Sequence, residues 1–193
     1  MNEPILPGDN KKETEWLAGE FGGEYFTQRI TLDLAGRTSI QVAKAWVDKL
    51  VTSIRQCDKK HMITVGVIPW LYYFPGAKPL FYSDEAGKNL DFVSVHFYPK
   101  KDDTQNALKA LKMYNVGKPI VVEEMFPLEC NTEELNSFIE GSRSFADGWV
   151  GFYWGKSLED YKSQANLDLS DTIVKAWLEY FQNKAGNIIK LKD

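Results

Sequence analysis

The sequence of 193 residues has little of what builds a covalent or metal-based scaffold: two cysteines and two histidines. Two cysteines are too few for a disulfide framework. Cys57 and Cys130 are far apart in the sequence, so neither has a second thiol near it at the spacing of a metal site. We therefore expect both cysteines to be buried or free thiols. His61, at a helix-to-strand turn, is not expected to bind a metal.

Long apolar runs and an excess of positive charge are also missing. The longest stretch without a charged residue or an amide, 62–77, contains two prolines and two glycines, and it is shorter than the about 20 residues of a membrane span. The net charge is −4 with acids and bases interleaved, so no basic face is available for phosphates. We expect no membrane and no nucleic-acid partner. The start at Met1 has neither the basic stretch nor the apolar core of a signal peptide, so no compartment is assigned from it.

What the chain does have is the composition of a folded domain, with 44% hydrophobic and 26% charged residues. Its length is close to that of one domain, and we expect 1–193 to form a single one. Aromatic residues are abundant: six Trp, nine Tyr and eleven Phe. They crowd into a few loop-like stretches, which an ordinary core does not require.

From residue 38 onward, helical periodicity alternates with short β-branched runs. Strands are predicted over 62–68, 91–98, 120–124 and 149–154. Helices are predicted from a capping box at Thr38, near Thr104, at Asn131 or Thr132, and near Ser170 or Asp171, with a short one starting at Ser83. This order is typical of parallel α/β proteins.

Two architectures fit four βα units in series: a doubly wound open sheet or part of a (β/α)₈ barrel. One face of the strand within 92–98 is apolar and the other is polar: Val93, Val95 and Phe97 alternate with Ser94, His96 and Tyr98. A doubly wound sheet needs apolar residues on both faces, whereas a barrel collects polar groups at its C-terminal mouth. We therefore predict a barrel, but a partial one, because a complete barrel takes about 250 residues.

Four short motifs lie at strand ends or at the chain start. They are Asn2-Glu3-Pro4, the His96-x-Tyr98 pair, the run from Lys118-Pro119 to Glu123-Glu124, and Gly151 to Trp154. Together they resemble the second half of a clan A glycoside hydrolase, most like the cellulase-type family 5 enzymes. In that family an Asn-Glu-Pro ends strand four, a His-x-Tyr ends strand six, a Glu ends strand seven and a Trp ends strand eight. All four motifs occur here in that order.

The resemblance implies a partial TIM barrel of four complete βα units plus the end of strand four. It implies a retaining O-glycoside hydrolase that acts on a β-linked oligo- or polysaccharide and needs no cofactor. Carried over by resemblance, Glu3 is the acid/base and Glu124 the nucleophile. The same resemblance gives substrate-binding roles to Asn2, His96, Tyr98 and Trp154. Trp70 is assigned a substrate-binding role as an aromatic of the loop 69–83.

Two neighbouring carboxylates compete for the nucleophile. Strand alternation puts Ile120, Val122 and Glu124 on one face and Val121 and Glu123 on the other. The family pattern has its catalytic Glu five residues after the proline, which is Glu124 here. Glu123 is then expected to point outward at the barrel rim as a structural carboxylate.

Each remaining candidate has a structural alternative. Tyr98 either donates a hydrogen bond to Glu124 or caps the core with its hydroxyl in water. His96 is either part of the site or a buried, satisfied histidine. Trp154 is either a platform under the sugar, in one cavity with Tyr98, or core filling. In the context of the four motifs we favour the functional interpretation of all three.

Two long loops, 5–37 and 69–83, are expected to overhang the mouth. Both are rich in aromatics: Trp16, Phe21, Tyr25 and Phe26 in the first, and Trp70, Tyr72, Tyr73, Phe74, Phe81 and Tyr82 in the second. Aromatics on loops at a catalytic face suit oligosaccharide subsites. The alternative is that the aromatics pack into a small hydrophobic core under each loop. The sequence does not say which aromatics bind sugar and which form this core.

Strands one to three have no counterpart in the sequence. We expect either a truncated member of the family or a chain that associates with itself through exposed barrel edges. The alternative function is a non-catalytic carbohydrate-binding protein or degenerate glycosidase fragment, which keeps the aromatic platforms without the rest of the site.

Overall fold

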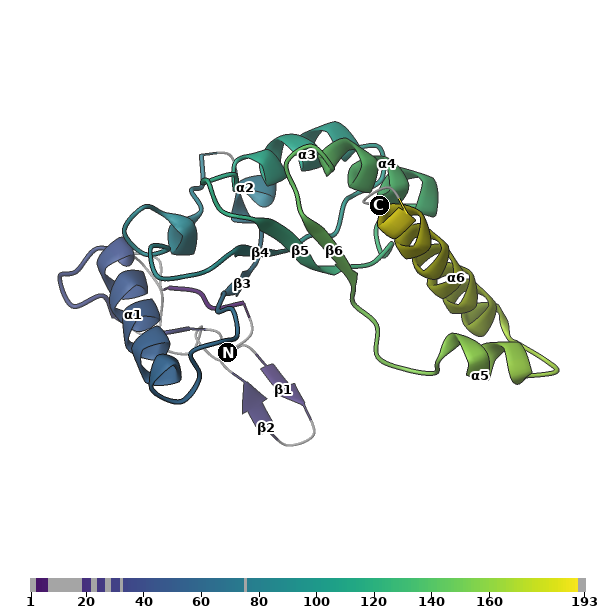
Figure 1. Cartoon of the computed structure of the whole chain (residues 1–193), viewed down its shortest axis with the longest axis horizontal. Helices are drawn as coiled ribbons and strands as arrows, with labels where there is room; N and C mark the ends of the chain where they lie inside the picture. Colours follow the sequence, from purple (N-terminus) through teal and green to yellow (C-terminus); the bar gives the residue numbers. More distant parts are fainter. Residues whose placement is uncertain are drawn as a thin grey trace.

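The computed structural model describes residues 3–6, 19–21, 24–26, 29–31, 33–74 and 76–190. Four parallel strands form one sheet in the order β3 (Gly66–Val67), β4 (Val93–His96), β5 (Ile120–Met125), β6 (Gly148–Gly151). A separate antiparallel pair consists of β1 (Gly19–Phe21) and β2 (Glu24–Phe26). The helices are α1 (Ser39–Cys57), α2 (Trp70–Tyr73), α3 (Thr104–Lys112), α4 (Thr132–Ser142), α5 (Leu158–Ser163) and α6 (Leu169–Lys190), with a 3-10 turn, η2, at Leu80–Tyr82. This order confirms the partial (β/α)₈ barrel (Figure 1).

Capping boxes set the start of three helices. Thr38 caps α1 through a reciprocal pair of hydrogen bonds with Gln41, and Asn131 caps α4 in the same way with Glu134. Each box satisfies amide groups that the first helical turn leaves without partners. Both predicted starts are confirmed. The sequence prediction omitted α5, which Ser157 caps.

The prediction of a short helix that starts at Ser83 is wrong. The helical turn there is η2, which ends at Tyr82, and the Ser83 hydroxyl instead accepts a hydrogen bond from the amide of Ala86 in a turn. The buried hydroxyl of Tyr82 links the residue before β3 to β4. It donates to the carbonyl of Val65 and accepts from the amide of Ser94.

The core lies between the sheet and the helices that cover one of its faces. In Figure 1, α2, α3 and α4 lie over the same side of the sheet. Val93, Val95 and Phe97 point to this side and are fully buried. The Phe97 ring stacks on Phe138 of α4 with centroids 5.0 Å apart. The apolar face predicted for this strand therefore packs on the helices.

At β6, the other face of the sheet is open to solvent. Trp149 faces the helices, because its indole donates to the hydroxyl of Ser142 in α4. Its neighbour Val150 therefore faces the other way and is 50% exposed, and Phe152 beyond the strand is 58% exposed. None of the helices in the described ranges is long and apolar enough to cross a membrane.

We propose that the chain associates with itself through this face and the sheet edges, because β3 and β6 each pair with one neighbour among the described strands. Burial of apolar surface and pairing of edge strands both favour association. Sedimentation velocity should show a sedimentation coefficient that rises with protein concentration. Val150→Lys, which puts a charge on an edge strand, should reduce that rise. A stable monomer at high concentration would contradict the proposal.

Candidate active site

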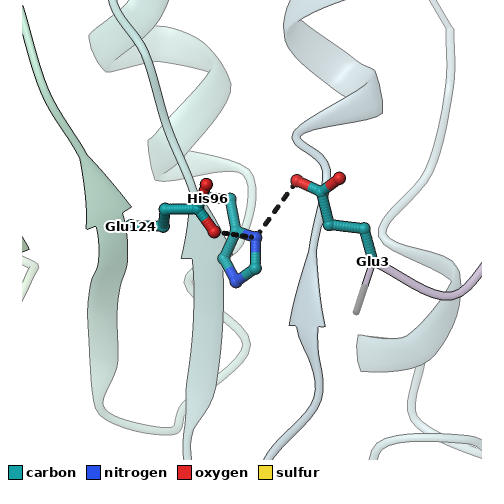
Figure 2. Close-up of side chains that lie close together, drawn as sticks. All are labelled: Glu3, His96 and Glu124. Atoms are coloured by element: carbon teal, nitrogen blue, oxygen red, sulfur yellow. Dashed lines mark hydrogen bonds and ion pairs between the residues drawn. The ribbon is translucent and has the colours of Figure 1, made fainter. Parts of the chain in front are cut away.

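Three side chains from distant parts of the sequence meet at the carboxyl ends of the strands. The imidazole of His96, at the end of β4, lies between the carboxylates of Glu3 and Glu124 (Figure 2). Its Nδ1 atom is 3.1 Å from Oε1 of Glu3 and 3.0 Å from Oε2 of Glu124. One oxygen of each carboxylate lies within 4.8 Å of the other. The structure thus brings together three of the residues that the motifs singled out.

A β-bulge brings Glu124 to this face. The register pairs Val93 with Ile120 and Val95 with Val122, then shifts so that His96 pairs with Glu124. Ile120 and Val122 are fully buried on the helix side. The extra residue of the bulge reverses the alternation, so Glu124 lies on the face of His96. Strand alternation alone predicts Glu124 on the face of Val122, and this prediction is wrong.

The bulge also corrects the placement of Glu123. Its carboxylate accepts a hydrogen bond from the hydroxyl of Ser94, a fully buried residue two positions before His96 on the same face of β4. Glu123 therefore does not point outward at the rim. Both consecutive carboxylates lie on the helix-free face of the sheet, with Glu123 exposed and Glu124 partly buried. Nothing in the residue pattern signals this bulge.

Glu3 is held by a short segment that pairs with another part of the chain rather than with the sheet. Pro4 is buried, and Ile5 forms a parallel bridge with Arg29. The amide of Ile30 donates to the carbonyl of Ile5 at 3.0 Å. Glu3 itself has φ +45°, a left-handed conformation that is uncommon for a residue with a side chain. Such backbone conformations are concentrated at functional sites.

Tyr98 contributes a hydrogen bond to the second carboxylate. Its hydroxyl donates to Oε1 of Glu124 at 2.5 Å. Burial, the hydrogen bond and the charge of Glu124 raise the pKa of Tyr98 far above its ordinary value. The hydroxyl therefore remains a donor at any physiological pH. Oε1 of Glu124 is bound by Tyr98 and Oε2 by His96, so the carboxylate is held at both ends.

The charge of His96 is set by opposing effects. Burial lowers the pKa of His96, whereas the hydrogen bond with Glu3 and the charges of Glu124, Glu3 and Glu123 raise it. The carboxylates prevail, and the pKa of His96 lies above its ordinary value. The imidazolium form therefore extends to higher pH in the folded protein than in an exposed histidine.

This raised pKa predicts how stability depends on pH. The folded state holds the proton of His96 more tightly than the unfolded state, so the stabilisation is complete below about pH 6.5 and is lost as the pH rises through the folded-state pKa. The free energy of unfolding, measured with urea at several pH values, should fall over that window. His96→Gln should remove this part of the slope. An unchanged slope in the variant would contradict the prediction.

An aromatic wall adjoins the three side chains. A pocket of about 410 Å³ is lined by Glu3, His96 and Tyr98 together with Trp70, Tyr73 and Phe74. Phe81 and Tyr82, from the same long loop, are instead buried in the core. The loop 69–83 thus divides its aromatics between the pocket and the core. On the pocket side, α2 ends after one turn, and Phe74 just after it is 57% exposed.

Trp154 does not lie with this group. The pocket that holds Glu3, His96 and Tyr98 is not lined by Trp154, which is 97% exposed. The expectation that Tyr98 and Trp154 share one cavity is therefore wrong. The hydroxyl of Tyr153 bonds to that of Tyr161 in α5 at 2.8 Å, and Lys156 pairs with Asp171 of α6 at 3.0 Å. These contacts hold the chain after β6 against α5 and α6.

Several predicted residues fall outside the part that the structure describes. Asn2 and Trp16 lie outside the described residues, and so do the side chains of Phe21, Tyr25 and Phe26. Both cysteines are free thiols, and Cys57 is exposed. Burial and the nearby Glu134 and Glu129 raise the pKa of Cys130 to about 11.

The composition of the triad, two carboxylates and an imidazole, is also one that binds metal ions. Among the described residues, Glu3, His96 and Glu124 are the group whose ligand atoms come close enough to share an ion. Nδ1 of His96 forms a hydrogen bond with Glu3 and an ion pair with Glu124.

Comparisons with known proteins identify the fold. No family model matches the sequence, and no curated protein matches it. The catalytic domain of endoglucanase Cel5A from Thermobifida fusca matches with a TM-score of 0.52 and 20% identity, over 74% of this chain and 54% of that domain. This chain thus spans about half of the endoglucanase domain. At this identity, the match shows a shared fold, a partial barrel like that of glycoside hydrolases, and it confirms the resemblance at that level.

Two structures of β-glucuronidases from Bacteroides uniformis also match. One is a calcium-binding mutant of β-glucuronidase 2, with a TM-score of 0.38, and the other a β-glucuronidase with a TM-score of 0.39. Each is 15% identical and covers 58% of this chain and 15% of the other. Their TM-scores are too low to add to the assignment of the fold.

Proposed function

We propose that this chain belongs to a retaining glycoside hydrolase that cleaves a β-linked oligo- or polysaccharide, with Glu3 as acid/base and Glu124 as nucleophile. The observation that carries the proposal is the approach of the two carboxylates, whose nearest oxygens lie within 4.8 Å. Retaining enzymes hold their two carboxyl groups about 5 to 5.5 Å apart, whereas inverting enzymes leave room for a water between them. The order of the motifs along the chain supports the same assignment.

In the first step, Glu124 attacks the anomeric carbon and forms a covalent glycosyl ester. The bond to the leaving oxygen breaks as Glu3 gives that oxygen its proton. Glu124 is suited to attack because Tyr98 and His96 each bind one of its oxygens and so fix its direction.

In the second step, Glu3 acts as a base. It takes a proton from a water molecule as the water oxygen attacks the anomeric carbon. The ester bond to Glu124 then breaks, which frees its carboxylate. Two inversions at the anomeric carbon give net retention. His96 lies against both carboxylates, so its charge acts on both steps.

The aromatic wall supports a carbohydrate as the substrate. Pyranose rings present apolar C–H faces that pack on aromatic rings. Trp70, Tyr73 and Phe74 line the pocket that also contains Glu3. Trp154, with 97% of its surface exposed, offers a further ring for a sugar, outside that pocket.

Product stereochemistry tests the proposal. The 193-residue chain should release the phenol from aryl β-glycosides, and proton NMR at early times should detect the β-anomer of the sugar before mutarotation. An initial α-anomer would mean that water attacks directly and would overturn the retaining mechanism. Boiled protein and a Glu124→Gln variant serve as blanks for contaminating hydrolases.

The second candidate is a non-catalytic carbohydrate-binding protein. The observation that supports it is that the chain spans 54% of the endoglucanase domain that it matches. An active site built from residues of a whole barrel would have only some of those residues in this chain. Isothermal titration with β-linked oligosaccharides separates the two candidates. Saturable binding without any turnover would favour the binding protein over the hydrolase.

A further inference from the structure

Gly66, in the edge strand β3, lies directly against the imidazole of His96. It pairs with Ser94 in the register of β3 and β4, so it shares a face with His96 two residues further along. A Cβ atom at Gly66 would be 2.3 Å from Nε2 and 2.9 Å from Cε1 of His96. Any side chain at this position would therefore overlap the ring.

We propose that Gly66 is a positioning residue of the active site: its missing side chain leaves the space in which the His96 ring directs Nδ1 to both carboxylates. The effect of Gly66 on catalysis rests on the proposed function. The geometric part of the inference, the fixed position of the ring, stands without that function. Gly66 does not touch the reacting atoms and acts only through His96.

The distances indicate how little movement the ring tolerates. Atoms in van der Waals contact stay about 3.5 Å or more apart, so a methyl group at residue 66 requires a shift of roughly 1 Å. The ring cannot keep both contacts after such a shift, because Nδ1 lies 3.1 Å from Glu3 and 3.0 Å from Glu124 and the two carboxylates approach from different segments. At least one of the two contacts is then lost.

The groups that face His96 determine what this loss does to its charge. Glu3 approaches from the N-terminal segment, and Glu124 and Glu123 from β5. From β3 the neighbour is Gly66, which carries no charge. All three carboxylates favour the imidazolium form, so displacement of the ring from them should lower the pKa of His96 toward its ordinary value.

A second glycine provides a matched control. Gly148 lies in β6, the opposite edge strand, and pairs with Val121 as Gly66 pairs with Ser94. A Cβ atom at Gly148 would be 3.5 Å from the nearest atom of Val121, an ordinary contact. Gly66→Ala and Gly148→Ala therefore make the same chemical change at equivalent places in the sheet, and the clash with His96 distinguishes them.

The first test is an NMR titration, which does not depend on activity. The chain has two histidines, so the imidazole signals are few, and exposed His61 is the internal reference. Gly66→Ala should lower the pKa of His96 and leave that of His61 as in the wild type, and Gly148→Ala should change neither. If Gly66→Ala leaves the pKa of His96 as Gly148→Ala does, the proposal is overturned.

The second test is a double-mutant cycle on stability. If the methyl group is unfavourable because of the ring, Gly66→Ala should lower the midpoint of thermal unfolding in the wild-type background and have little effect when His96→Ala is also present. An equal decrease of the unfolding midpoint in both backgrounds would mean that the methyl group destabilises the backbone and not the His96 ring. That result would overturn the proposal. The double variant keeps the test decisive if the single variant does not fold.

The third test addresses the reaction. On an aryl β-glycoside, Gly66→Ala should reduce kcat by about 100-fold, as displacement of a catalytic contact by about 1 Å does, with KM little changed and the pH optimum displaced. Gly148→Ala should keep wild-type values. A wild-type chain without turnover would refute the proposed function, while the NMR titration still decides the role of Gly66. Normal kinetics for Gly66→Ala in an active enzyme would refute the positioning role in catalysis.

Discussion

Glu124→Gln is expected to abolish turnover of β-glycosides, with a loss on the order of 10⁴-fold or more in kcat. An amide is a far weaker nucleophile than a carboxylate and cannot form the glycosyl ester. The substitution is nearly isosteric, and the hydroxyl of Tyr98 can still donate to the amide oxygen. Release of a phenol from an aryl β-glycoside, followed by absorbance, measures the effect.

Glu123→Gln is the matched control for this prediction. Glu123 neighbours Glu124 in the sequence and lies on the same face of the sheet, but it accepts its hydrogen bond from Ser94. An amide oxygen can accept the same hydrogen bond, so activity should be largely retained. Full activity in Glu124→Gln with loss in Glu123→Gln would reverse the two roles. Full activity in both would remove the carboxylate pair from the mechanism and favour the binding protein.

Glu3→Gln is expected to divide substrates by their leaving groups. A dinitrophenyl β-glycoside needs little protonation of its leaving oxygen, so the first step should proceed and the covalent intermediate should accumulate. An initial burst of phenol followed by a slow steady state is the expected trace. Oligosaccharides, whose leaving alcohols require a proton, should lose activity by on the order of 10³-fold or more.

Azide provides the second half of this test. It attacks the intermediate without a base, so it should restore steady-state release in Glu3→Gln and give the β-glycosyl azide, with net retention. Azide should not accelerate Glu124→Gln on the same substrate by that route, because no such intermediate forms. A Glu3→Gln variant that loses all substrates equally, with no response to azide, would contradict the role of Glu3 as acid/base.

Local chemistry allowed much of the fold to be predicted from the sequence. The helix starts at Thr38 and Asn131 follow from side chains that bond amides three residues away, and such contacts are visible in the sequence. The two faces of β4 follow from an alternation of period two, which also pointed to a barrel. The resemblance singled out Glu3, His96 and Glu124 because their motifs occur in family order.

The geometry of the site was decided by contacts between distant segments. The bulge in β5 is a shift in the register between β5 and β4. Because of it, Glu123 and Glu124 lie on the same face, whereas simple alternation puts them on opposite faces. Trp154 lies outside the cavity that the sequence predicts for it, and the chain after β6 contacts α5 and α6.

The sequence by itself determined the parallel α/β order, the helix caps, the polar face of β4 and the identity of the candidate carboxylates. Only the tertiary structure decided that Glu3 and Glu124 meet across His96, that Glu123 shares their face and that Gly66 leaves room for the ring. The physical reason is the range of the interactions. Caps and alternation act between residues a few positions apart, whereas register and steric contact between strands depend on segments that the fold alone brings together.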